Sequence, residues 1–485
     1  MATTTKKTGL ILSLIVILSF FLRFYRFSHR WVLNQDQARD TVMIMYALKN
    51  KTLPLLGSPA SAGPFNFGPY YHWLIGFFKN TIPGISGPWI GFTAFSAIMP
   101  FLFYFIGKNT INKSFALLVA LLSAITIGQV AHAPDMLNTV LTSYLVTISF
   151  FCLSRHIKNS NCITLFLFSY FTSLATVSHF QSLGIFSLTF LVLLSELLRK
   201  QSIKEKIIKV TIIAFSTLLT YLPLIIFDIN NQGLWIKSVI NYYVSGQNKF
   251  YYPVRWLTDI FVFWPQLWGQ VISGNVLVGY GLSALFIFSL IINLKNIKKH
   301  KFILFLTASF LLQVILIRYY KGVRSPEYFF TFHPYFIFFT GWTLWQIRQK
   351  QKTFAIIISF GLLLIISKNN LKLIINDQSQ AHIIQQIKKD IEIKTGQGSF
   401  SFYTLHGDNM VNLPLVYLFY HQGQIRDGGY KIGTCQSKTN QSCPDSGLIV
   451  SKHQNYTIYD LNEHKIEEYD HFSPQKIYNW LYVNY

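Results

Sequence analysis

The chain has 485 residues, of which 51% are hydrophobic and 17% aromatic but only 13% charged. These proportions exclude an ordinary soluble globular protein and indicate a polytopic membrane protein. The net charge of +23 does not indicate nucleic-acid binding, because the basic residues form short clusters between apolar segments, where lipid headgroups and chain orientation account for them.

Apolar segments suited to crossing about 30 Å of hydrocarbon recur through most of the chain. We predict eleven membrane-spanning helices, which make residues 1–367 an α-helical transmembrane domain. They lie near residues 9–27, 86–106, 115–131, 137–154, 162–178, 183–198, 208–227, 276–294, 302–317, 329–347 and 353–367.

Clusters of Lys and Arg lie at every second boundary between spans, and the positive-inside rule places these boundaries in the cytoplasm. The clusters are Lys6/Lys7, Lys108/Lys113, Arg155/Lys158, 199–209, 295–301 and 348–352. We therefore expect a multi-pass protein of the cell membrane, with the N-terminus inside and the C-terminus outside. One group conflicts with the rule, since Arg23, Arg26 and Arg30 crowd the opposite end of the first span.

The first outer segment, residues 28–85, is expected to fold at the membrane surface. Within it, apolar residues near helical spacing predict a helix over Asp36–Lys49, preceded by Asn34 as a suitable N-cap. Asp36 and Asp40 are four residues apart, so they share one face near the positive end of this helix. A stretch rich in Gly and Pro follows, and then the aromatic run 70–73.

The second outer segment, residues 228–274, contains four tryptophans. Trp256, Trp264 and Trp268 fall on one side of a helix that Pro265 interrupts. This pattern favours an interfacial helix over a further span.

Residues 368–485 are more polar and acidic than the rest of the chain, and we predict a small soluble α+β domain outside the membrane. Cys435 and Cys443 lie here, where an oxidising compartment would permit a disulfide, although two free thiols fit the sequence equally well.

Acidic residues are scarce before position 377, and a membrane chain that keeps a few carboxylates usually has a use for them. Eight acidic residues precede position 377. The predicted topology places six of them on the outer side, namely Asp36, Asp40, Asp135, Asp228, Asp259 and Glu327. Asp135 lies in a very short loop between two spans, so it must stay close to the membrane surface.

Clustered carboxylates at one membrane face suit a site that binds a hard divalent cation or removes a proton from a nucleophile. Lys321 and Arg324, on the same side, are suited to holding a phosphate. A carboxylate and a phosphate-binding group at a lipid interface suggest transfer from a lipid phosphate. The chain has no P-loop, GxGxxG, HExxH or paired CxxC motif.

An ordered set of motifs over residues 9–367 resembles the GT-C membrane glycosyltransferases, most closely the bacterial branch related to protein mannosyltransferases and the lipid A aminoarabinose transferase. The set comprises the acidic pair after the first span, Gly68 to Trp73, Asp135, His179-Phe180-Gln181, Pro223 to Asp228, Tyr320-Lys321-Gly322 and Glu327-Tyr328. No single motif in it is specific. The chain departs from many relatives at Phe67-Gly68-Pro69, where they have a lysine before the proline.

The resemblance implies an inverting transfer, on the outer face, from a polyprenyl-phosphate-linked sugar to a lipid, glycan or protein acceptor. It makes Asp36, Asp135 and Asp40 the candidate catalytic residues, with Asp36 as the base or a metal-linked activator. Relatives differ in their need for a metal, and Asp36 and Asp135 are the candidate ligands of a divalent cation such as Mg, Mn or Zn. Candidate substrate-binding residues are Lys321, Arg324, Tyr70, His72, His179 and Glu327.

Two other functions fit a polytopic protein. A transporter or a flippase of lipid-linked saccharides also keeps charges in the membrane, but such proteins tend to carry them at mid-membrane and to have internal repeats. A receptor or assembly protein built around the C-terminal domain would leave the first-loop acids unexplained.

Overall fold

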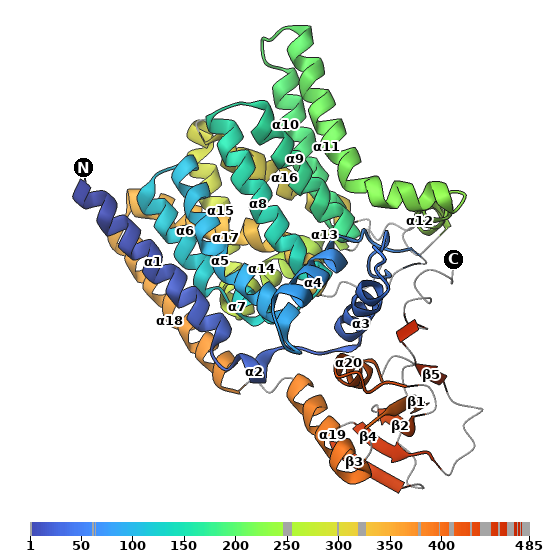
Figure 1. Ribbon diagram of the computed structural model, residues 1–485. Helices are drawn as coiled ribbons and strands as arrows, with labels where there is room; N and C mark the ends of the chain where they lie inside the picture. The colour runs from blue at the N-terminus through green and yellow to red at the C-terminus, as the bar shows by residue number, and fades with distance from the viewer. Residues whose placement is uncertain are drawn as a thin grey trace. The chain divides into compact units, whose positions relative to one another are not determined.

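The computed structural model describes residues 2–60, 63, 65–245, 255–297, 300–318, 326–376, 380–396, 398–406, 412–426, 429–436, 448–453, 456–462, 470–472, 474–475 and 477. The chain divides into two compact units (Figure 1). We call residues 1–25, 55–71 and 92–376 the helical unit, and residues 26–54, 72–91 and 377–485 the mixed unit.

The helical unit is a bundle in which neighbours along the chain pack together, as α8 does on α9 and α14 on α15. Its elements are α1 (Ala2–Phe24), α5 (Gly87–Thr110, from Phe92), α6 (Lys113–Ile125), α7 (Ile127–Ala131), α8 (Asn138–Lys158), α9 (Cys162–Ser178), η1 (Phe180–Ile185), α10 (Phe186–Leu197), α11 (Ile203–Asn230), α12 (Leu234–Ser245), α13 (Arg255–Thr258), η2 (Asp259–Phe263), α14 (Trp264–Ser273), α15 (Val276–Ile297), α16 (Lys301–Arg318), η3 (Pro326–Phe332), α17 (His333–Lys350) and α18 (Lys352–Asn376).

The eleven predicted spans fall on helical segments, although the one at 115–131 covers both α6 and α7 and the one at 329–347 begins in η3. The chain is a multi-pass membrane protein. Among the described residues, eight helices are long and apolar enough to cross a membrane, and they include α1, α5, α8, α10 with η1, α11, α15, α16 and α18. Helices α6 and α9 are apolar but have only 13 and 17 residues. Every side chain of α17 from His333 to Gln346 is buried, so protein surrounds this helix.

Trp264 and Trp268 of the second outer segment lie inside the helical unit. The Trp264 ring packs 4.7 Å from that of Phe332, and Trp268 packs 5.2 Å from Phe336 and donates from Nε1 to Thr340 Oγ1 at 2.9 Å. Both indoles are buried. Helix α14 is thus held by aromatic packing, whereas the predicted interfacial position of residues 228–274 stays a prediction.

Arg23 accounts for part of the conflict in the charge pattern at the end of the first span. Its side chain is fully buried, and it donates to Ser96 Oγ at 3.0 Å and to the carbonyls of Ala124 and Ser123 at 2.8 and 3.1 Å. These carbonyls lie at the C-terminal end of α6, where a cation is favoured. Arg23 therefore ties helices together inside the protein and does not contact headgroups.

The mixed unit contains a five-stranded sheet in the order β3-β4-β2-β1-β5. Strands β1 and β2 are parallel and joined through α20, and the other pairs are antiparallel. This confirms the predicted small α+β region. The elements are α2 (Phe27–Arg30), α3 (Gln35–Lys49), α4 (Tyr70–Thr81, from His72), α19 (Gln380–Thr395), β1 (Phe400–His406), α20 (Leu413–His421), β2 (Tyr430–Gln436), β3 (Leu448–His453), β4 (Tyr456–Asp460) and β5 (Asp470–Phe472).

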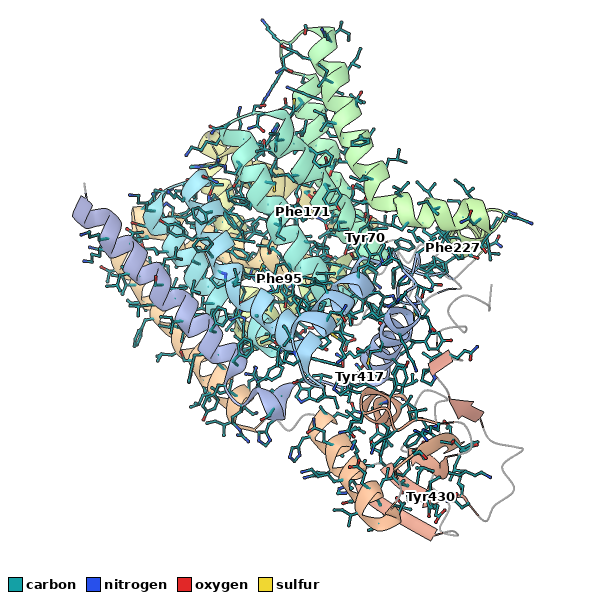
Figure 2. The ribbon with its side chains drawn as sticks, in the orientation of Figure 1. Tyr70, Phe95, Phe171, Phe227, Tyr417 and Tyr430 are labelled. Carbon is teal, nitrogen blue, oxygen red and sulfur yellow. The ribbon has the colours of Figure 1, made fainter. Side chains whose placement is uncertain are left out.

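Helix α20 joins the C-terminal region to residues early in the chain. Tyr417 on α20 (Figure 2) donates to the carbonyl of Ile85, and its ring packs 5.5 Å from that of Trp89. Helix α20 also packs on α3. The mixed unit thus includes residues 26–54 and 72–91, which composition alone assigns to the transmembrane domain 1–367.

Of the cysteines, Cys152 and Cys162 are free thiols, whereas Cys435 in β2 is disulfide-bonded. Cys443 lies outside the described residues.

Candidate functional site

The first candidate acid, Asp36, lies in the first turn of α3. The predicted cap is present, since Asn34 Oδ1 accepts from Gln37 N at 3.0 Å and Gln37 Oε1 accepts from Asn34 N at 3.0 Å. This capping box fixes where the helix begins. Apolar residues such as Ala38 and Val42 are fully buried, so α3 is held in one rotation with Asp36 at the edge of the buried face.

Arg39 bridges the two carboxylates of α3. Its Nη1 lies 2.7 Å from Asp36 Oδ1, and its Nε lies 2.8 Å from Asp40 Oδ1. The Asp36 side chain is 50% exposed, whereas those of Arg39 and Asp40 are 5% and 4% exposed. The shared helix face predicted for the acidic pair is therefore present, and only Asp36 opens to the surface.

Helix α4 brings His72 to the buried acid. A Cβ on Gly76 would lie only 3.3 Å from Ile44 Cγ2, so the missing side chain lets α4 approach α3 closely. One turn earlier on both helices, His72 Nε2 lies 3.5 Å from Asp40 Oδ1. His72 is 0% exposed. Its predicted role in substrate binding is not favoured, because the imidazole is buried behind Asp40.

The pKa of Asp40 reflects these contacts. Burial alone would raise it, but the Arg39 guanidinium and the hydrogen bond with His72 hold the pKa well below the ordinary value of 3.8. Asp40 is therefore ionised across the physiological range and cannot exchange a proton there, so its geometry supports a supporting role better than the catalytic one that the sequence suggests.

Asp135 lies in the helical unit, in the short loop between α7 and α8. Its loop is held by two hydrogen bonds, from Thr93 Oγ1 to the Ala133 carbonyl at 3.0 Å and from Tyr71 Oη to the Met136 carbonyl at 2.7 Å. His132 Nδ1 lies 3.4 Å from Asp135 Oδ2. The Asp135 side chain is 13% exposed and His132 is 38% exposed, so this pair reaches the surface mainly through the imidazole.

The remaining substrate-binding candidates are more scattered. His179 is buried between aromatic rings, 4.7 Å from Phe67 and 5.6 Å from Tyr328. Glu327 lies in the first turn of η3 and is exposed. The hydroxyl of Tyr70 (Figure 2) donates to the Leu219 carbonyl of α11 at 3.2 Å. Lys321 and Arg324 lie outside the described residues.

Arg39, a residue that sequence reasoning did not select, thus joins Asp36 to Asp40, and His72 contacts Asp40 directly. Its position three residues after Asp36 was the available signal, since such pairs meet on a helix. Asp36 and Asp135 belong to different units, and their joint metal site stays a prediction. In the described ranges, no group of three or more His, Cys, Asp or Glu residues is placed to hold a metal ion, so we derive no step through a metal.

No protein-family model matches this chain, and no curated protein matches it significantly. The fold is that of the GT-C membrane glycosyltransferases, which confirms the predicted fold class.

In particular, the chain shares its fold with ArnT from Cupriavidus metallidurans. The apo structure of ArnT gives a TM-score of 0.62 at 8% identity, covering 94% of this chain and 98% of ArnT. The structure bound to undecaprenyl phosphate gives 0.60 at 9% identity with the same coverage. At such identities the similarity establishes the fold, and it extends over nearly the whole of both chains.

Proposed function

We propose that this chain is a membrane glycosyltransferase that transfers a sugar from a polyprenyl-phosphate-linked donor to an acceptor at the outer membrane face. The observation that carries the proposal is the GT-C fold over 94% of the chain, shared with a protein solved with undecaprenyl phosphate bound. The acceptor class stays open among lipids, glycans and proteins.

Asp36 is the proposed base. Its carboxylate is half-exposed and held at the start of a capped helix, where a substrate hydroxyl can reach it. The acceptor oxygen would give its proton to Asp36 and bond to the anomeric carbon as the carbon–oxygen bond to phosphate breaks, which inverts that carbon. Polyprenyl phosphate leaves with the bonding electron pair.

The charge that develops on the leaving phosphate must be offset by nearby cations or hydrogen-bond donors. We retain Lys321 and Arg324 as the proposed phosphate-binding residues. Asp135 is the proposed second acid, and its partner His132 is a potential hydrogen-bond donor to an anion at 38% exposure.

A direct test is to reconstitute the purified protein in liposomes with undecaprenyl-phosphate-linked pentose or hexose, together with a membrane extract as acceptor. Mass spectrometry would follow the conversion of donor to free undecaprenyl phosphate. A glycosyltransferase is expected to produce it in proportion to sugar incorporated into the extract. A transporter or flippase would move the donor across the bilayer and leave it chemically intact, which would overturn the proposal.

A further inference from the structure

Three charged side chains on α3 form one compact group with an uneven exposure. Arg39 contacts both Asp36 and Asp40 at less than 3 Å, yet it is only 5% exposed. Because Asp40 is buried and Asp36 is half-exposed, Asp36 is the carboxylate of this group that a ligand can reach.

Arg39 makes this arrangement stable. Carboxylates four residues apart on a helix repel each other, and a buried carboxylate without a counter-charge is costly. The guanidinium fork meets both demands, since Nε binds Asp40 while Nη1 binds Asp36. A lysine ammonium is a single point charge on a flexible stem and cannot present two donors at fixed spacing in this way.

We propose that Arg39 is a positioning residue for Asp36. Asp40, held in turn by His72, fixes the guanidinium, and the guanidinium fixes the Asp36 carboxylate at the helix start. This inference rests on the proposed function, in which Asp36 is the base. The burial of Arg39 argues against its acting as a ligand of the donor phosphate, because a 5% exposed guanidinium offers a phosphate little surface.

A double-mutant cycle tests this coupling. Single-turnover transfer would be measured for the full-length protein in liposomes, using wild type, Arg39→Gln, Asp36→Asn and the double variant. We expect Arg39→Gln to lower the rate about tenfold or more at saturating donor with little change in donor KM. In the Asp36→Asn background the same substitution should have no further effect.

Independent penalties that multiply in the double variant would overturn the inference, and so would a loss confined to KM, which would indicate donor binding. Arg39→Lys keeps the charge and should recover the rate only in part. Full recovery would show that the fork is not needed. Lys49→Gln makes the same charge change in the last turn of α3, where the side chain is exposed, and should leave the rate unchanged.

Folding is checked by size exclusion and thermal unfolding of each variant. If Arg39→Gln does not fold, His72→Gln serves as a milder variant, because it removes the contact that holds Asp40 against Arg39. We expect it to lower the transfer rate by a smaller factor, and to have no further effect in the Asp36→Asn background. A wild-type rate for Asp36→Asn would refute the proposed base itself. A slow Asp36→Asn beside fully active Arg39→Gln and His72→Gln would refute only the positioning role.

Discussion

At the scale of single residues, burial gives two similar carboxylates different chemistry. Asp36 and Asp40 lie one turn apart, but the first is 50% exposed and the second 4% exposed. Asp40 forms ion contacts with Arg39 and His72, and its pKa is held down by them. Asp40 therefore stabilises the packing of α3 against α4, while the half-exposed Asp36 carboxylate is accessible to a ligand.

Replacing Asp40 by Asn tests this stabilising role. The substitution leaves buried Arg39 without one of its counter-charges, and breaking a buried pair typically costs about 3 kcal/mol or more. We expect a lower thermal unfolding midpoint for Asp40→Asn in detergent at neutral pH.

The same comparison should depend on pH. Because the pKa of Asp40 in the folded protein lies below 3.8, the contribution of its carboxylate to stability is complete above pH 3.8 and is lost as the pH falls through the folded pKa. The difference in unfolding midpoint between wild type and Asp40→Asn should therefore become smaller below pH 3.8. An equal difference at all pH values would contradict the stabilising role of the Asp40 carboxylate.

The sequence was sufficient to locate Asp36, its helix and the Asn34 cap, because capping and periodicity are local signals. It favoured Asp36 over Asp40 as the reacting acid, but it could not show that Asp40 is buried and paired while Asp36 is half-exposed. That distinction depends on His72, which lies on another helix and reaches Asp40 through the close approach at Gly76.

At the scale of elements, α14 and α15 approach more closely than side chains would allow. A Cβ on Gly279 would lie 1.8 Å from the Pro265 carbonyl oxygen and 2.5 Å from Gly269 N. Trp264 and Trp268 on α14 pack into aromatic rings of the helical unit. Sequence patterns cannot distinguish this packing from an interfacial belt, because both place tryptophans on one face of a helix.

A methyl group at Gly279 should force the two helices apart. We expect Gly279→Ala to destabilise the protein by about 1–3 kcal/mol, as overpacking commonly does, and to lower the unfolding midpoint followed by tryptophan fluorescence. Gly281→Ala lies on the same helix with nothing within 4 Å of its Cβ, so it serves as the matched control. Equal midpoints for the two variants would show that the close approach is not required.

At the scale of the whole molecule, the membrane class and the C-terminal α+β region follow from composition, which changes sharply along the chain. The number of membrane-spanning helices cannot be read from composition in the same way. A span is predicted at residues 329–347, but α17 is not among the eight described helices that are long and apolar enough to cross a membrane, and its residues from His333 to Gln346 are buried in protein. Helices α6 and α9 fall short of the usual length. The grouping of residues 26–54 and 72–91 with the C-terminal region depends on tertiary contacts that no local pattern reveals.

The predicted topology can be checked by cysteine labelling. In a background with Cys152 and Cys162 replaced, Asn50→Cys should react with a membrane-impermeant maleimide in intact cells, because it follows α3 on the predicted outer side. Lys204→Cys should react only after permeabilisation, since it lies in a predicted cytoplasmic basic cluster. Both positions are exposed. The reverse pattern would place Asp36 in the cytoplasm and contradict the topology.

The most direct test of the central claim is the rate of sugar transfer from undecaprenyl-phosphate-linked donor by Asp36→Asn compared with wild type. The amide keeps the size of the side chain but cannot take a proton, and loss of a general base typically costs about 100-fold or more. We predict a fall of that size with donor binding retained. Transfer by Asp36→Asn at the wild-type rate would contradict the account.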